Sequence, residues 1–307
     1  MISVISYRLI LLGIAVLPQP WAFALARQFG RIRYRWLRTR RWKQAENLRF
    51  KLVCTNKAVE KLLCRSFELE VSDHLESALF QLRPKSTIEH MVDIRGLEHL
   101  DAALRQGNGA ILYSGHVWGN YTFFASLGLR GYRTNLVRLE PARGMSRVQR
   151  WFHDRFSSSV ESFGCRALWY QPGTPGSSAG VAQALSRNEI VIILVDLSQS
   201  KRNVPVSFFG EDIGFPTGPI VQAKASGAPL LDFFVYRPDS WYPEVAEIGQ
   251  PYHPQADIVE SVQHCARCLE EQIRQHPAEW APWHVFGTAT PSPTSLERTI
   301  SPEGIQP

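Results

Sequence analysis

The sequence predicts an α/β fold with a largely parallel central sheet, helices on both faces, and a preceding N-terminal membrane-anchor helix. Strand-like apolar runs alternate with helix-like segments through the middle of the chain, which is the pattern of a parallel sheet. Hydrophobic residues make up 44% of the 307 residues, sufficient for a substantial core. An uncharged apolar run at residues 9–26 predicts the anchor.

The apolar run at 9–26 lies between Arg8 and Arg27 and is just long enough to span a bilayer. Pro18 and Pro20 interrupt it and disfavour one straight helix. Either one kinked span or two short half-helices in the membrane interface fits this pattern. The prolines and the lack of a small-residue cleavage site argue against a secretory signal peptide.

Basic residues are concentrated directly after this run. The net charge is +6, and seven arginine and lysine residues lie between positions 31 and 43. Such a cluster favours anionic lipid headgroups or nucleic acid. Because the cluster adjoins an apolar run and no nucleic-acid-binding motif is apparent, we expect anionic membrane lipids as partners and no nucleic acid. If the run spans the membrane, the cluster holds its C-terminal side in the cytoplasm.

Three segments divide the chain. Residues 1–43 are the predicted membrane anchor and basic segment, 44–287 the α/β domain, and 288–307 a disordered tail rich in Ser, Thr and Pro. Helical spacing of apolar residues predicts helix through most of residues 28–82.

Within the α/β domain, apolar runs predict strands and amphipathic segments predict helices. The predicted strands and extended pieces are 110–116, 134–140, 189–196, 204–210, 229–237 and 245–252. The predicted helices are 97–106, 121–129, 145–159, 180–188, 216–228 and 257–277.

Five cysteines form no regular framework, which is typical of a reducing compartment. Cys265 and Cys268 have a metal-like spacing, with His264 and His276 near. They lie on one amphipathic helical segment, however, and no second pair of this spacing exists. We therefore interpret them as small apolar core residues and expect no metal.

Three polar residues end three different predicted strands: His116, Arg138 and Asp196. Ligands of parallel sheets bind outside the carboxyl ends of the strands. We therefore expect these side chains to converge on one site.

The order of several sequence phrases resembles the late acyltransferases of lipid A biosynthesis, which are related to the glycerolipid acyltransferases. The resemblance runs from the N-terminal anchor to about Phe286. Each phrase alone is weak, and their order makes the resemblance specific. The phrases are QAENLRF (44–50), GLEHLDAALRQGNGAILYSGHVWGN (96–120), NEIVIILVDLSQ (188–199), the segment 204–237 with its Phe-Phe-Gly and Thr-x-Gly, and EEQIRQHPAEWAPWHVF (270–286).

The resemblance implies transfer of a fatty acyl chain from a thioester to a hydroxyl, with the thioester as co-substrate and no cofactor. It implies that His116 removes the hydroxyl proton. The family has an Asp or Glu after four intervening residues, to orient the imidazole. Here Tyr121 stands at that position, or Thr122 if the turn is one residue longer, and neither is acidic.

Three explanations of this departure remain open at the level of sequence. Asp196 supplies the carboxylate from another strand, or Tyr121 or Thr122 hydrogen-bonds the imidazole without charge. In the third, the site does not catalyse and only binds lipid.

Further substrate-binding residues are implied by the resemblance. The arginines offer oxyanion or phosphate contacts, unless they are surface residues. The Phe-Phe-Gly phrase is expected to build an acyl-chain wall and a tight turn, and the Thr-Gly pair opens a helix whose N-terminus faces an anion or is merely capped. These candidates are Asn120, Arg138, Arg155, Phe208, Phe209, Gly210, Thr217 and Gly218.

The resemblance thus implies a membrane-associated acyltransferase on the cytoplasmic face of a bacterial inner membrane. Its donor would be acyl carrier protein or acyl-CoA, and its acceptor a hydroxyl of a lipid or glycolipid. The alternative is a catalytically impaired relative that binds acyl chains or scaffolds a membrane lipid or polysaccharide assembly.

Overall fold

A computed structural model describes most of the chain from residue 17 to residue 286. The described residues are 17–52, 55–79, 82, 84–140, 158, 161–171, 174, 178–196, 202–284 and 286. The predicted helix at 145–159, Arg155 within it, and the predicted tail at 288–307 lie outside the described residues, apart from Ser158.

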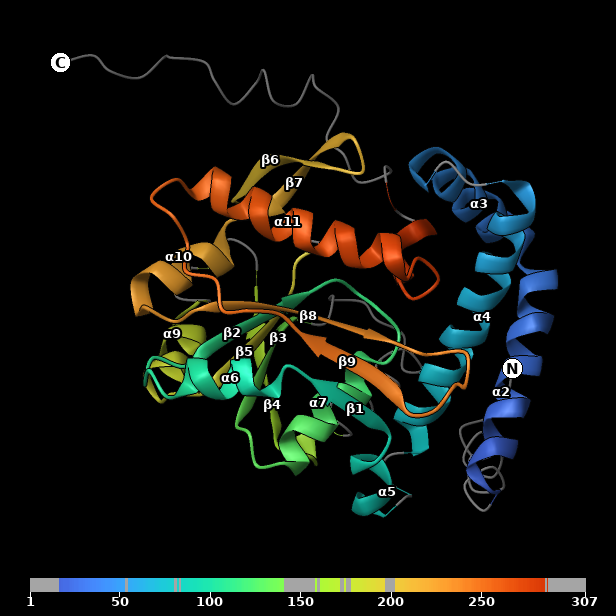
Figure 1. The fold of residues 1–307 in the computed structure, drawn as a ribbon, viewed down its shortest axis with the longest axis horizontal. Helices are drawn as coiled ribbons and strands as arrows, with labels where there is room; N and C mark the ends of the chain where they lie inside the picture. The colour runs from blue at the N-terminus through green and yellow to red at the C-terminus, as the bar shows by residue number, and fades with distance from the viewer. Residues whose placement is uncertain are drawn as a thin grey trace.

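Three helices form a layer at one end of the sheet (Figure 1): α2 (Gln19–Trp36), α3 (Arg38–Leu52) and α4 (Asn56–Leu79). Pro18 precedes α2 and Pro20 occupies its first turn, so the prolines begin a helix instead of breaking one. A Cβ on Gly30 would lie 2.5 Å from Glu68 Cα, so this glycine permits the close crossing of α2 and α4. An ion pair between Arg33 and Glu70 (3.2 Å) supports the crossing.

The predicted membrane span is not found in this layer. Among the residues from 17 onward that the structure describes, no helix combines the length and apolar character needed to cross a bilayer. Helix α2 carries Arg27, Arg31, Arg33 and Arg35 along its length, which explains this result. Residues 9–16 of the apolar run lie outside the described residues.

A seven-stranded sheet forms the centre of the molecule, in the order β1-β9-β8-β2-β5-β3-β4. Strands β8, β2, β5, β3 and β4 are mutually parallel, and β9 runs antiparallel to β8. The prediction of a largely parallel sheet is therefore confirmed. The strands are β1 (Val92–Arg95), β2 (Ala110–Ser114), β3 (Thr134–Leu139), β4 (Cys165–Tyr170), β5 (Ile190–Leu194), β8 (Leu230–Tyr236) and β9 (Glu244–Ile248).

Helices cover the sheet on both sides, with α11 and a β6–β7 hairpin on one side and α5 and α7 on the other (Figure 1). The hairpin strands are β6 (Asn203–Phe208) and β7 (Glu211–Pro216). The helices are α5 (Lys85–Glu89), α6 (Leu97–Leu104), α7 (Asn120–Leu129), α9 (Ala179–Ser186), α10 (Gly218–Ser226), α11 (Ile258–Gln275) and the short 3₁₀ helix η2 (Ala281–His284).

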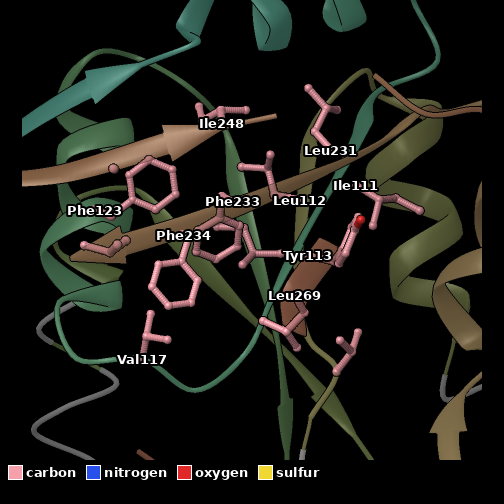
Figure 2. Close-up of a cluster of buried hydrophobic side chains, with 14 of the residues drawn as sticks. Ile111, Leu112, Tyr113, Val117, Phe123, Leu231, Phe233, Phe234, Ile248 and Leu269 are labelled. Carbon is pink, nitrogen blue, oxygen red and sulfur yellow. The ribbon is translucent and has the colours of Figure 1, made fainter. Parts of the chain in front are cut away.

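Strand β2 lies in the middle of the core, and all five of its residues are buried. Continuous burial is typical of a parallel strand covered by helices on both faces. Figure 2 shows Leu112 and Tyr113 of this strand among Phe233 of β8, Phe123 of α7 and Leu269 of α11. The core therefore holds rigid the strand that leads directly to His116.

Candidate active site

Two adjacent strands carry His116 and Asp196 to the same edge of the sheet. Strands β2 and β5 are parallel, and Ser114 at the end of β2 is paired with Leu194 at the end of β5. His116 lies two residues after Ser114, and Asp196 lies two residues after Leu194. Because both residues follow paired strand ends by the same number of positions, they meet although they are 80 positions apart in the sequence.

The His116 imidazole and the Asp196 carboxylate are in direct contact. The Nδ1 atom of His116 lies 2.6 Å from Asp196 Oδ1, and the backbone N–H of His116 donates to Asp196 Oδ2 at 2.7 Å. The Asp196 side chain is fully buried, whereas 41% of the His116 side chain is exposed. The histidine therefore presents one edge to solvent while a buried carboxylate holds the other.

A tryptophan completes the environment of this carboxylate. The indole N–H of Trp280 donates to Asp196 Oδ2 at 2.7 Å. Trp280 lies beside the end of α11 in the chain and is itself buried. No property of the sequence around it distinguishes a hydrogen-bond donor from a core tryptophan, so its contact with Asp196 is visible only in the fold.

Gly115 makes the close approach of Asp196 and Trp280 possible. A Cβ at this position would lie 2.8 Å from Asp196 Oδ2 and 3.1 Å from Trp280 Nε1. Any larger residue would push the carboxylate away from the His116 backbone.

Opposite shifts of pKa follow from this geometry. Burial alone would lower the pKa of His116, but the charge and hydrogen bond of Asp196 raise it above the ordinary value. Burial alone would raise the pKa of Asp196, but His116 and the N–H donors hold it below the ordinary value. Asp196 is therefore ionised at neutral pH. An ionised carboxylate can only accept, so it places the proton of a neutral imidazole on Nδ1 and leaves Nε2 free as a base.

The turn that follows His116 is held from several sides. Asn120 is buried, and its side-chain N–H donates to the carbonyl of Gly115 at 3.0 Å. Gly119 has a φ of +93°, a conformation that favours glycine, and its N–H donates to Asp73 of α4 at 2.7 Å. Asn120 thus serves inside the turn in this structure.

Tyr121, Thr122 and Arg138 have the following surroundings in the fold. The ring of Tyr121 packs edge-on against Phe124, with ring centroids 5.7 Å apart. Thr122 is buried in α7. The guanidinium of Arg138 lies 5.3 Å from the ring centroid of Trp169, at the carboxyl edge of β3 and β4. Of the candidate partners named from the sequence, Asp196 is the one with a hydrogen bond to His116 Nδ1, at 2.6 Å.

Phe208, Phe209 and Gly210 end β6 and form the hairpin turn. Phe209 and Gly210 have φ of +53° and +74°, as a two-residue hairpin turn requires. Both phenylalanines are buried and pack against Trp280 at centroid distances of 6.0 Å. They therefore form the aromatic layer behind the tryptophan that contacts Asp196.

Thr217 and Gly218 stand at the start of α10. The Thr217 hydroxyl donates to the carbonyl of Arg202 at 3.2 Å and makes no capping hydrogen bond to α10. Gly218 has open space around its Cα.

A narrow apolar pocket, with a cavity volume of about 10 Å³, lies near the dyad of His116 and Asp196. It is lined by Tyr113 of β2 and by Val195, which directly precedes Asp196, and it extends between β7, α10 and α11. Its lining residues are Tyr113, Val195, Phe215, Pro216, Pro219, Ile220, Leu230, Val262 and Cys265.

Metal-ligand side chains do not gather in the part of the chain that the structure describes: no three His, Cys, Asp or Glu residues form a metal-binding group there. Cys265, from the metal-like pair, is buried and its pKa is raised to about 12 by burial. Chemically, the site offers an imidazole oriented by a carboxylate, beside an apolar pocket. This arrangement suits proton abstraction from a hydroxyl next to an apolar chain.

Comparison with known proteins places this geometry in context. The sequence profile of the bacterial lipid A biosynthesis acyltransferases matches residues 3–284. The phosphatidylinositol mannoside acyltransferase of Mycobacterium tuberculosis (strain H37Rv) is 29% identical over 192 residues, 61% of this chain and 57% of that protein. The phosphatidylinositol mannoside acyltransferase of Mycolicibacterium smegmatis is 26% identical over 197 residues, 62% of this chain and 60% of that protein. The alignments thus span less than two thirds of either relative.

Proposed function

This chain belongs to the bacterial lipid A biosynthesis acyltransferase family, and from that premise we propose that it transfers a fatty acyl chain from a thioester to a hydroxyl of a lipid or glycolipid. The observation that carries the proposal is the 2.6 Å contact between His116 Nδ1 and Asp196 Oδ1. It supplies the carboxylate that the sequence lacks after His116.

In the proposed reaction, His116 is the general base. The acceptor hydroxyl oxygen attacks the thioester carbonyl carbon while Nε2 of His116 takes the hydroxyl proton. The C–O bond forms, the C–S bond breaks, and the imidazolium returns its proton to the leaving thiolate. Asp196 stabilises the imidazolium and keeps the ring in the orientation that exposes Nε2.

Substitution of His116 tests this role. We expect His116→Ala to slow single-turnover transfer from acyl carrier protein carrying a labelled acyl chain by about 10³-fold or more. His253→Ala is the matched control: it removes an exposed histidine next to Tyr252, which pairs with Leu230 at the amino end of β8, and it should transfer normally. Equal rates of transfer by His116→Ala and wild-type protein would show that His116 is not the general base.

The apolar pocket is the proposed site of the acyl chain. It lies next to both dyad strands, so a chain that enters it would place a thioester carbon near His116. Its cavity volume of about 10 Å³ is close to that of one water, so an acyl chain must displace the lining side chains to enter. The expectation that Phe208 and Phe209 form the acyl-chain wall changes accordingly, because they lie behind Trp280 and Phe215 lines the pocket.

The donor is proposed to be acyl carrier protein or acyl-CoA. Both are anionic, and the net charge of +6 suits either. The relatives are named for acylation of a phosphatidylinositol mannoside, which favours a glycolipid acceptor here. Arg138 at the same sheet edge, and Arg155, are proposed to contact its anionic groups.

We further propose that α2 and α3 lie on anionic lipid at the cytoplasmic face of a bacterial inner membrane. The outer face of α2 exposes a stripe of large apolar side chains at helical spacing, and Trp36 at its end is 81% exposed. Its opposite face is buried against α4. The stripe consists of Trp21, Leu25, Phe29, Ile32 and Trp36, with Trp42 and Phe50 exposed on α3.

Basic residues accompany this stripe, including the exposed Arg35, Arg38, Lys43 and Arg49. An apolar helix face flanked by basic residues is typical of a helix that lies in the interface of an anionic membrane. A helix that lies in the membrane interface does not have to cross the bilayer, and the composition of α2 agrees with such a position.

Vesicle binding tests the membrane proposal. The double variant Phe29→Ser and Ile32→Ser should lose most of its co-sedimentation with phosphatidylglycerol vesicles. The control variant Val221→Ser and Val259→Ser, which replaces exposed apolar side chains on α10 and α11, should not. Equal binding by both double variants, or equal binding to phosphatidylcholine vesicles, would contradict it.

The alternative function is a catalytically impaired relative that binds acyl chains or scaffolds a membrane assembly. The contact between Asp196 and His116 favours catalysis over this alternative. Binding of an acyl thioester without any single-turnover transfer would favour the alternative.

A further inference from the structure

We propose that Trp280 is a positioning residue, which holds the Asp196 carboxylate in the orientation that His116 needs. The proposal rests on the proposed acyl transfer and assigns a role to a residue outside the dyad. Its starting point is the 2.7 Å hydrogen bond from the Trp280 indole N–H to Asp196 Oδ2.

The hydrogen bonds of Asp196 divide between its two oxygens. Oδ1 contacts the His116 imidazole, and Oδ2 accepts from the His116 backbone and from Trp280. Because the side chain is fully buried, water does not compete for Oδ2. The two donors at Oδ2 define the plane of the carboxylate and direct Oδ1 at the imidazole.

The backbone around Trp280 is joined to the turn that contains His116. Val117 and Trp280 form an antiparallel bridge, and the N–H of Ala281 donates to the carbonyl of His116 at 2.9 Å. The N–H of Trp118 donates to the carbonyl of Glu279 at 3.1 Å. The backbones of Trp280 and His116 are therefore joined directly, although the two residues are 164 positions apart in the sequence.

The ring of Trp280 is held rigid by its aromatic neighbours. Its centroid lies 4.6 Å from that of Trp283 and 5.3 Å from that of Phe286, and Phe209 stacks on it at 6.0 Å. Offset and edge-to-face contacts of this kind restrict a ring to one orientation. The indole N–H is thus fixed in direction before any substrate binds.

The same segment is attached to the N-terminal layer. The Asn47 side chain of α3 donates to the carbonyls of Trp283 at 2.6 Å and Phe286 at 3.1 Å. This contact gives the QAENLRF phrase a structural role that the dyad alone does not explain. Asn47 supports the segment, whereas Trp280 alone among these residues reaches Asp196.

Trp283 provides a matched control. It is as buried as Trp280, belongs to the same aromatic group, and also donates one indole hydrogen bond, but to the carbonyl of Pro277 at 2.7 Å. Replacing either tryptophan with phenylalanine removes one indole and one N–H donor. Only Trp280→Phe removes a donor from Asp196.

The experiment compares wild-type protein, Trp280→Phe and Trp283→Phe, each as the full chain. The first measurement is the pKa of Asp196 by ¹³C NMR on aspartate labelled at the carboxyl carbon, with Asp196→Asn to assign the signal. The second is single-turnover transfer from labelled acyl carrier protein. Trp280→Phe should raise the pKa of Asp196 by about one unit, because a donor to the carboxylate is lost. It should slow transfer by roughly tenfold or more.

Trp283→Phe keeps an aromatic ring beside Trp280 and removes no donor from Asp196. It should therefore leave the pKa of Asp196 unchanged and keep the rate within about twofold of wild type. If the two variants change the pKa and the rate equally, or if Trp280→Phe leaves the pKa unchanged, Trp280 only packs and the proposal is wrong. If wild-type protein transfers no acyl chain, the proposed function fails, while the NMR comparison still decides whether Trp280 positions Asp196.

Discussion

Buried carboxylates lie on two sides of the turn 115–119, and the two environments differ in charge balance. On one side, Asp196 contacts the imidazole of His116 and two further N–H groups. On the other side, four buried carboxylates surround the guanidinium of Arg237. They are Asp73, Glu76, Glu244 and Glu279.

The pKa shifts in the two environments have opposite signs. Donors and the imidazole hold the pKa of Asp196 below its ordinary value. Burial raises the pKa of Glu279 to about 7 and raises that of Asp73 and, strongly, that of Glu244. Arg237, together with Arg65 near Glu279 and His74 near Asp73, does not offset the burial of four carboxylates, so part of the group holds protons near neutral pH.

Burial alone therefore does not decide the charge of a carboxylate. Asp196 remains ionised because its neighbours stabilise the charge, and an ionised partner stabilises the imidazolium that the proposed base, His116, becomes. The group around Arg237 instead holds the turn 115–119 through a hydrogen bond from the Gly119 backbone N–H to Asp73. A second hydrogen bond, from the Arg237 backbone N–H to Glu279, holds the group itself together. Four predictions test this distinction.

The largest expected effect follows removal of charge from Asp196. Asp196→Asn should lower kcat by about 10³- to 10⁴-fold, the effect of neutralising an orienting carboxylate in a serine-protease triad. The base must be neutral, so kcat/KM falls as pH drops through the pKa of His116. Without the charge of Asp196, burial lowers that pKa, and the acid limb should move from above 6.5 to lower pH.

Glu244→Gln is the matched control for that substitution. An amide resembles a protonated carboxyl, the form that burial favours at Glu244. Its pH profile and rate should therefore stay close to those of the wild type. A large loss of activity in Glu244→Gln would contradict the claim that the charge of the carboxylate matters at Asp196 and not at Glu244.

Removal of the central arginine should cost the most stability. Arg237→Met leaves the carboxylate of Glu76 buried without its cation, and we expect the free energy of unfolding in urea to fall by about 3–5 kcal/mol. Arg95→Met, which breaks an exposed ion pair with Glu247, should cost about 1 kcal/mol or less. Similar losses in both variants would show that the buried group has little structural importance.

Neutralising Glu279 should change how stability depends on pH. Its folded pKa of about 7 exceeds the ordinary 4.5, so the native protein binds the extra proton between these values. Stability contributed by this group is then full below about pH 4.5 and is lost as pH rises to about 7, with an upper bound of about 3 kcal/mol. Urea unfolding of Glu279→Gln should show a flatter dependence than wild type over this range. Identical slopes would contradict the raised pKa.

The smallest effect is expected from a methyl group beside Asp196. Gly115→Ala should lower kcat by roughly tenfold to a hundredfold, because the added Cβ displaces the carboxylate. Gly180→Ala, in α9, meets only an ordinary contact of 3.4 Å with Leu168 and should be neutral. Full activity of Gly115→Ala in the single-turnover assay would mean that the carboxylate tolerates movement.

Several elements were predictable from local pattern. The continuous apolar runs before His116 and Asp196 became the central strands β2 and β5, because buried parallel strands need apolar residues on both faces. Strands β1, β4 and β7 were not predicted. β1 and β4 lie toward the edges of the sheet, β7 belongs to the separate hairpin, and all three are short or partly exposed, so their sequences lack a continuous apolar run. The anchor was predicted from residues 9–26, and α2 begins inside that run because proline suits a helix start.

Apolar runs in the sequence place His116 and Asp196 at strand ends, and they leave Asp196, Tyr121 and Thr122 as candidate partners of His116. The choice among these candidates depends on how the strands are arranged. The order of strands places β5 beside β2, and the common register brings Asp196 to the imidazole. The contact of Trp280 with Asp196 depends on the path of the chain after α11. Local sequence governs backbone propensity and burial, whereas contacts between distant residues arise from the packing of the whole chain.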